Sequence, residues 1–385
     1  MLPQTWQPGA ILVALVAAIL WAGRRKSLQP LFKWLPMPLW CYAVPLVLRS
    51  IGWLPAEHPS YQWLTDVLLP LSLALLLLGL QLQTVLRSGS RAVAAMAVGS
   101  CGIMVGATGM WWLCRRWLPA EAWKGVGILS ATWTGGSLNM LAVRSILDVS
   151  DAVFAPLVVV DAMMAYGWMA CLLALRPASA SIDRWLRASS TARSADDSTT
   201  RESSGSIGWS TQCGVFALAL VLMLGSRALA ARLPTGSLVA NRSGWTILLV
   251  STLSLLISAA PSFRTLGQPG ASVGYPCLYL VLATLGARAN LAALFGTPVW
   301  IIVGVGTVLT HAIALLVAGR LFRWPMSLLA TSSQANVGGV VSAPLVAALY
   351  ESELAPVGLM LALLGNALGT YIGLGAAALC LRLVK

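Results

Sequence analysis

Long apolar runs recur along the chain and are separated by short polar or basic segments. Each run approaches the roughly 20 apolar residues that a helix needs to cross a bilayer. Twelve such segments can be marked, at 9–23, 37–54, 63–86, 92–114, 122–147, 152–176, 211–233, 243–260, 275–296, 297–321, 325–350 and 355–383. The pattern therefore predicts an all-α polytopic membrane protein with about 10–12 spans.

Two of these segments contain a polar interruption with a pair of adjacent glycines. The fifth segment is interrupted at 131–139, and the eleventh is interrupted at 331–339. Gly, Ser, Thr and Asn are poor residues for a helix interior, and a glycine pair favours local unwinding. We therefore predict a broken helix near each interruption. The glycine pairs are Gly135-Gly136 and Gly338-Gly339.

The interruptions fall at matching places in two halves of the chain. An Ala-Thr pair opens each interruption, and an Ala-Pro pair follows each one after a similar distance. Further upstream, the glycine spacing of 79–89 recurs at 286–296. These matches predict a duplication, with one half at 1–176 and the other at 210–385. Between them, 177–209 is rich in Ser and Thr and is predicted to be a flexible polar linker, with a short interfacial helix near Ile182–Leu186.

The number of segments conflicts with an inverted repeat. Inverted halves need an odd number of spans between matching helices, whereas the pattern gives six. The basic residues at 24–26 place the N-terminus outside, while Arg382 and Lys385 favour an internal C-terminus. We therefore expect one marked segment to be re-entrant or miscounted, and the range 211–260 is the first candidate. Parallel halves are the alternative.

Composition supports lipid as the main solvent and excludes several classes of function. Hydrophobic residues make up 58% of the chain and charged residues only 10%, against about 25% in soluble domains. The net charge of +13 comes from cations in short runs between apolar segments, which indicates a bacterial inner-membrane protein and not a nucleic-acid-binding one. The seven cysteines have no metal-ligand spacing and there are only two histidines, so we expect no metal centre and no cofactor other than bound sodium.

Three motifs resemble one known family. They are WTGGSLNM at 133–140, VVVDAMMAYGW at 158–168 and QANVGG at 334–339. The chain is similar to the membrane proteins grouped as domain of unknown function 819. That family is similar in pattern to the cation/proton antiporter and anion transporter superfamily, which includes bile-acid/sodium symporter-like folds. The resemblance implies two inverted-topology repeats with crossed discontinuous helices, arranged as a core domain plus a panel domain. It implies no particular substrate.

Polar groups within the apolar segments are the candidate site residues. Asp161 is the first of them, because a carboxylate in an apolar helix costs about 3 kcal/mol on insertion scales. It is interpreted as a proton carrier, a cation ligand or a member of an ion pair. Arg288 is a candidate partner or anion-binding group, although its side chain can also extend to the interface. The other candidates are Thr132, Thr134, Gly135, Gly136, Asn139, Gln334, Asn336, Gly338, Gly339 and Asn366.

Hard oxygen ligands of the kind that sodium prefers are available among these residues. Asn139, Asp161, Gln334 and Asn336 are the candidate sodium ligands, with the alternative that the amides only cap broken helix ends. His311 lies in an apolar run, and a hydrogen-bonded packing role is favoured over a proton relay.

These features predict a secondary active transporter that works by alternating access. It moves a small anionic organic solute, coupled to a sodium or proton gradient, because paired helix breaks in two halves indicate a transporter site. A channel or a lipid-handling membrane protein is the alternative. The chain has no catalytic serine, zinc-protease or phosphate-loop motif, so we do not expect an enzyme. The expected partners are a small-molecule solute and membrane lipid, with a homodimer left open.

Overall fold

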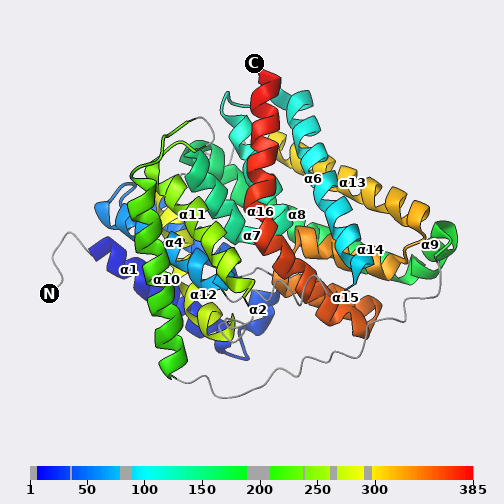
Figure 1. Cartoon of the computed structure of the whole chain (residues 1–385), viewed down its shortest axis with the longest axis horizontal. Coiled ribbons are helices and arrows are strands. Elements are labelled where there is room, and N and C mark those ends of the chain that lie inside the picture. Colours follow the sequence, from blue (N-terminus) through cyan, green and yellow to red (C-terminus); the bar gives the residue numbers. More distant parts are fainter. Residues whose placement is uncertain are drawn as a thin grey trace. The chain divides into compact units, whose positions relative to one another are not determined.

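The computed structural model describes residues 7–34, 37–78, 89–188, 209–236, 239–260, 267–289 and 297–384. Every regular element in these residues is a helix (Figure 1). Among them, eight helices are long and apolar enough to cross a membrane. They are α1 (Gln7–Arg24), α4 (Pro59–Leu78), α6 (Ser90–Cys114), α8 (Asp151–Leu175), α10 (Trp209–Ala230), α12 (Gly267–Arg288), α13 (Thr297–Phe322) and α16 (Ala355–Val384). The prediction of an all-helical polytopic membrane protein is confirmed.

The other helices are shorter or are broken by a turn. Two of them, α3 (Met37–Ser50) and α11 (Arg242–Ser258), lie in segments that the sequence marked as apolar. Asn241 caps α11, because its side chain accepts a hydrogen bond from the Gly244 backbone N–H at 2.7 Å. The remaining helices are α2 (Gln29–Trp34), α7 (Ala122–Leu147), α9 (Ser179–Leu186), α14 (Met326–Val337) and α15 (Gly339–Tyr350).

The chain divides into two compact units, and each unit combines segments from both halves of the sequence. Unit 1 consists of 1–79, 145–159 and 207–297, and unit 2 consists of 80–144, 160–206 and 298–385. In unit 1, α12 packs closely on α3 and α4, because Gly286 lies against the Tyr42 backbone and Gly270 against that of Leu75. Small residues at such positions let membrane helices approach.

The α7 segment turns back on itself at Gly136. This residue has φ 73° and ψ −175°, a combination that is essentially restricted to glycine. A Cβ placed on Gly373 of α16 would lie 2.5 Å from the Gly127 carbonyl oxygen and 3.1 Å from a Val143 methyl group. In a straight helix these two residues would be about 24 Å apart. We call α7 the first hairpin, with arms 122–135 and 137–147.

A second hairpin is formed by α14 and α15, which lie beside each other in Figure 1. The chain turns at Gly338 and Gly339, and Gly339 has φ 72°. The two ends of the hairpin bind neighbouring parts of the chain, α9 and the last turns of α8. At its start, the Met326 N–H donates to Asp183 of α9 at 2.6 Å, and at its end the Tyr350 hydroxyl donates to the Leu172 carbonyl at 2.6 Å.

The helix breaks are shorter than the sequence predicted. Residues 131–135 and 331–337 are helical, so each break is confined to the glycines. The range 211–260, which was expected to hold a re-entrant or miscounted segment, forms the two packed helices α10 and α11. Only α10 is long enough to cross a membrane by its length and composition, and the expectation for this range stays a prediction. The chain folds back at the two hairpins.

Part of the predicted linker is helical. Within 177–209, α9 forms where the interfacial helix was expected, and its Leu186 is fully buried against Leu329 and Gly319. Residues 189–208 lie outside the described residues, and so do most of the repeated glycine motifs at 79–89 and 286–296.

Candidate ion and solute site

A stripe of glycines on α16 holds the first hairpin. Gly365, Gly369 and Gly373 are spaced by four residues and therefore share one face of the helix. Their Cα atoms pack on backbone carbonyl oxygens of the first arm, and a Cβ at Gly369 would lie 2.8 Å from the Ala131 oxygen. At Gly365 a Cβ would overlap the Thr134 oxygen. The hairpin is thus seated by direct backbone contact.

The Asn139 carboxamide is inserted into the hydrogen-bond ladder of α16. Its Nδ2 donates to the Asn366 carbonyl at 3.1 Å, and its Oδ1 accepts from the Thr370 backbone N–H at 2.8 Å. These are the two groups that a regular helix would pair with each other. The same Nδ2 donates to the Gly135 carbonyl at 2.7 Å, and Oδ1 also accepts from the Thr370 hydroxyl at 2.6 Å. Asn139 therefore fixes the tip of the first hairpin against α16.

Asp161 lies on α8 beside the first arm of this hairpin. The Thr132 hydroxyl donates to its Oδ1 at 3.1 Å, and the side chain is only partly buried. Among the described residues, no basic side chain forms an ion pair with it. A carboxylate in an apolar helix with a single hydroxyl donor retains the capacity to bind a cation or a proton.

The second hairpin is held by a chain of hydrogen bonds through His311 of α13. Its Nδ1 donates to the Gly99 carbonyl of α6 at 2.8 Å, which leaves Nε2 of the neutral ring to accept from the Ser333 hydroxyl at 2.8 Å. The Ser333 oxygen in turn accepts from Trp168 Nε1 at 2.8 Å. His311 is fully buried, and these bonds fit the packing role that the sequence favoured for it.

One face of α8 contacts both hairpins. Asp161 binds the first hairpin through Thr132, and Trp168 binds the second through Ser333. These two residues of α8 are seven positions apart, which places them two turns apart on one side of the helix, about 10 Å along its axis. The two glycine turns, one from each half of the sequence, are therefore assembled on a common helix within unit 2.

A second link between the hairpins is Met96 of α6. Its carbonyl accepts from Asn336 Nδ2 at 3.2 Å, and its Cε would lie 3.0 Å from a Cβ at Gly365, where the first hairpin is seated. Asn336 Oδ1 accepts from the Ser100 hydroxyl at 3.3 Å. Both the nitrogen and the oxygen of the Asn336 amide are therefore hydrogen-bonded.

Several buried side-chain oxygens of the two hairpins have no hydrogen-bond partner in the described part of the chain. Those nearest the glycine turns are Thr134 Oγ1 in the first hairpin and Gln334 Oε1 in the second. Gln334 Nε2 donates across the turn to Ser342 at 2.8 Å. Because a buried unpaired polar group costs about 1–3 kcal/mol, these oxygens are suited to a ligand. Of the four candidate sodium ligands, Asp161 and Gln334 keep free acceptor positions, whereas the amides of Asn139 and Asn336 are used to hold the hairpins.

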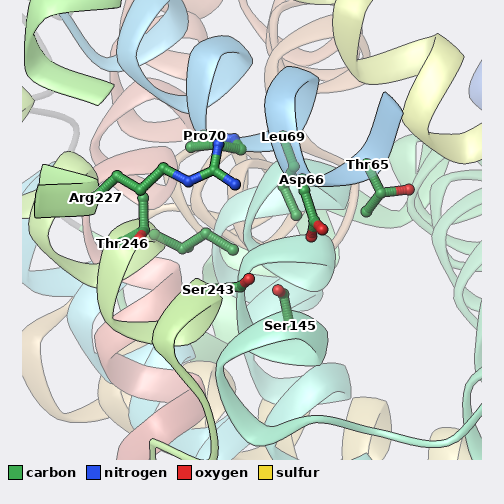
Figure 2. A pocket seen from close by; sticks show the side chains of 9 residues that line it. Thr65, Asp66, Leu69, Pro70, Ser145, Arg227, Ser243 and Thr246 are labelled. Atoms are coloured by element: carbon green, nitrogen blue, oxygen red, sulfur yellow. The ribbon is translucent and has the colours of Figure 1, made fainter. Parts of the chain in front are cut away.

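Unit 1 contains a small polar pocket, shown in Figure 2. Asp66 of α4 and Arg227 of α10 line it together with Ser145, Ser243 and Thr246. Its volume is about 20 Å³, which is room for one water molecule. This pocket is too small for an organic solute, so the candidate site remains the one in unit 2.

The comparison with known proteins agrees with the three sequence motifs. The family described as "Protein of unknown function (DUF819)" matches residues 10–383. The chain belongs to this family. It is also similar to the uncharacterized membrane protein YjcL of Bacillus subtilis (strain 168), with 24% identity over 371 residues, covering 92% of this chain and 93% of the relative. The predicted DUF819 membership is confirmed, and similarity to the antiporter superfamily stays a prediction.

Arg288 of this DUF819 protein belongs to unit 1, whereas the candidate site is built from residues of unit 2. It forms an ion pair with Asp151 at 3.3 Å and contacts Gln62 at 3.5 Å, and all three residues belong to unit 1. The structure therefore gives Asp151, and not Asp161, as its partner. Sequence reasoning missed this pairing, because the two residues are far apart in the chain and only the packing of unit 1 brings them together.

The hydrogen-bonding residues that hold the second hairpin were also missed. Trp168, Ser333 and Ser342 carry no distinctive spacing, since each is an ordinary residue of an apolar helix. The only signal was that Trp168 closes one of the family motifs and that Ser333 lies inside the second interruption.

Replacing Arg288 by glutamine is expected to leave solute uptake near the wild-type rate. The pair with Asp151 is partly exposed, so its loss should lower the free energy of unfolding by at most about 1 kcal/mol. Uptake into proteoliposomes and thermal unfolding in detergent measure the two effects. The double variant Asp151→Asn/Arg288→Gln should unfold at a temperature no lower than that of the single variant. If Arg288→Gln no longer bound the solute, Arg288 would have to be a solute-binding residue.

Proposed function

We propose that this protein is a secondary active transporter of the bacterial inner membrane and not an enzyme. It moves a small anionic organic solute, coupled to a sodium or proton gradient, by alternating access. The observation that carries the proposal is the pair of glycine-turned hairpins, one from each half, that contact the same face of α8 next to Asp161. Paired helix breaks of this kind mark the binding sites of many transporters.

We further propose that the two halves are inverted repeats with one re-entrant hairpin each. The elements recur in order at an offset of about 205 residues: α6 and α13, α7 and the α14–α15 hairpin, and α8 and α16. If each hairpin enters and leaves on one side, and if the shorter helices α3 and α11 cross as well as the eight long ones, each half has five crossings. They are α1, α3, α4, α6 and α8 in the first half, and α10, α11, α12, α13 and α16 in the second. Five is odd, so this arrangement removes the conflict over the number of spans. In this arrangement, two hairpins that enter the membrane from opposite sides take the place of the crossed discontinuous helices that the family resemblance implies.

Counted from the helix starts, Asp161 and Asn366 lie at similar positions, although the Ala-Pro match of the two halves pairs Asp161 with Leu361. Asp161 is ten residues after the start of α8, and Asn366 is eleven residues after the start of α16. The corresponding helix of each half thus carries a polar side chain at its middle, but only one of the two ionises. We propose that Asp161 carries the coupling ion and that the second half provides neutral polar contacts.

The hairpin turns offer both signs of partial charge. At each turn one arm ends with free carbonyl groups and the other begins with free N–H groups. A cation would bind Asp161 together with carbonyl and hydroxyl oxygens near it, such as the Thr132 hydroxyl that contacts the carboxylate. An anionic solute would bind the N–H groups that begin at Ser137 and Gly339. Gln334 Oε1, an unpaired oxygen, adds an acceptor at the second turn.

Transport is tested by uptake of radiolabelled carboxylates into proteoliposomes with an imposed gradient. We expect uptake to depend on an inward sodium or proton gradient and to collapse when an ionophore dissipates that gradient. Liposomes without protein are the control. Uptake at the same rate with and without either gradient would contradict coupling to sodium or protons. Single-channel currents would favour a channel.

A further inference from the structure

An apolar cavity of about 180 Å³ lies between α6 and α16 in unit 2. Its floor is formed by Met96 and Leu364, which are buried, while Cys101 and Leu368 at its mouth are exposed. The lining is apolar apart from Ser100. Since membrane helices normally pack without such gaps, a cavity of this size between two of them can hold a ligand.

Residues that line the cavity also contact the second hairpin and the part of α16 that holds the first hairpin. The Met96 carbonyl accepts from Asn336 of the second hairpin at 3.2 Å, and the Ser100 hydroxyl that borders the cavity donates to the same residue at 3.3 Å. Leu364 precedes Gly365, against which the tip of the first hairpin is packed. A molecule in the cavity would therefore have its apolar part between α6 and α16 and its polar end toward the two turns.

We propose that the transported solute is a monocarboxylate with one compact apolar group, and that this group occupies the cavity between α6 and α16. This inference rests on the proposed transport function and specifies its substrate class. The volume resembles the 150 Å³ engineered cavity that binds benzene, so the group has the size of a six-membered ring or a short branched chain. Two methionines, Met96 and Met104, line the cavity and can adjust to groups of different shape.

Cys101 at the mouth provides a direct test, because its labelling reports occupancy without any gradient. A variant that retains only Cys101 is reconstituted and treated with a neutral methanethiosulfonate reagent. We expect cyclohexanecarboxylate to slow labelling at least fivefold, and acetate and succinate to leave it unchanged. A matched variant that retains only Cys171, an exposed cysteine of α8 outside the cavity, should label at the same rate with every compound.

A cavity-filling substitution provides the second measurement. Ala97 lines the cavity at its exposed side, and Ala97→Phe should abolish the thermal stabilisation of the protein by cyclohexanecarboxylate. Ala97→Ser, which adds one small atom, should preserve it. Equal stabilisation of both variants would overturn the proposal.

The outcomes separate this inference from the transport function. Gradient-driven uptake of succinate, with no protection of Cys101 by cyclohexanecarboxylate, would overturn the substrate class and leave transport standing. Protection without gradient-driven uptake of any carboxylate would support the cavity as a binding site and contradict the transporter. If Cys101 is shielded in phospholipid vesicles and no carboxylate changes its labelling, lipid chains fill the cavity and the proposal is wrong.

Discussion

Asp161→Asn is expected to abolish gradient-driven uptake while the protein remains folded. The carboxylate lies in an apolar helix, accepts one hydrogen bond from Thr132, and is without a basic partner among the described residues. Asparagine keeps the size and can still accept from Thr132, but it carries no charge to bind a cation and cannot exchange a proton. Uptake with and without the gradient, together with size-exclusion chromatography, measures the effect. A decrease of at least 100-fold in gradient-driven uptake is expected.

The matched control is Asp66→Asn, which makes the same change in unit 1, where Asp66 accepts from Gln62 on the same helix. It should retain most of the uptake. Asp161→Glu should keep partial coupling, because the charge is preserved and only its position shifts. If Asp161→Asn transported with unchanged gradient dependence, Asp161 would have no part in coupling.

Gly136→Ala should impair uptake severely without any steric clash. A Cβ at this position has only Asn366 Oδ1 near it, at 3.9 Å, so there is room for a methyl group. The backbone angles, however, are nearly inaccessible to alanine, and holding them costs about 1–3 kcal/mol. The turn should relax and carry Thr134 and Asn139 away from α16, which we expect to reduce uptake more than tenfold.

Gly109→Ala in α6 is the control for this substitution. It also has open space around its Cβ but lacks a positive φ, so it should leave uptake unchanged. Gly339→Ala, with φ 72° and open space, should behave like Gly136→Ala. Equal uptake by the Gly109 and Gly136 variants would show that the turn geometry does not matter for transport.

The amino-acid sequence was sufficient to locate the apolar helices, the glycine turns and Asp161. Each of these has a local signal, namely the length of an apolar run, a glycine pair, or a charge among apolar residues. The direction of the chain after Gly136 has no such signal, because 26 helical residues are long enough for either a span or a hairpin. The glycine stripe of α16, more than 200 residues away, decides between them by seating both arms.

The roles of individual polar residues were harder to predict for the same reason. Asn139 was a candidate ligand or cap, and the structure uses all of its hydrogen-bonding capacity on the tip of its own hairpin and on α16. Arg288 was a candidate partner for Asp161, but packing within unit 1 pairs it with Asp151. In both cases the residue type determines which interactions the side chain can form. A helix far away in the sequence determines which partner it binds.

The two hairpins should enter the membrane from opposite sides. The ends of the second hairpin lie beside α9 and the end of α8, where Arg176, Arg184 and Arg187 favour the cytoplasmic face. The first hairpin should then open to the external face. Single cysteines introduced at Ser150, just after the first hairpin, and at Glu351, just after the second, are both at exposed positions.

This orientation is tested with a membrane-impermeant maleimide applied to intact cells, in a background without the seven native cysteines. The Ser150→Cys variant should be labelled in intact cells, and the Glu351→Cys variant should be labelled only after the membrane is opened. Labelling of both variants from the same side would contradict the opposed hairpins and, with them, the proposed site.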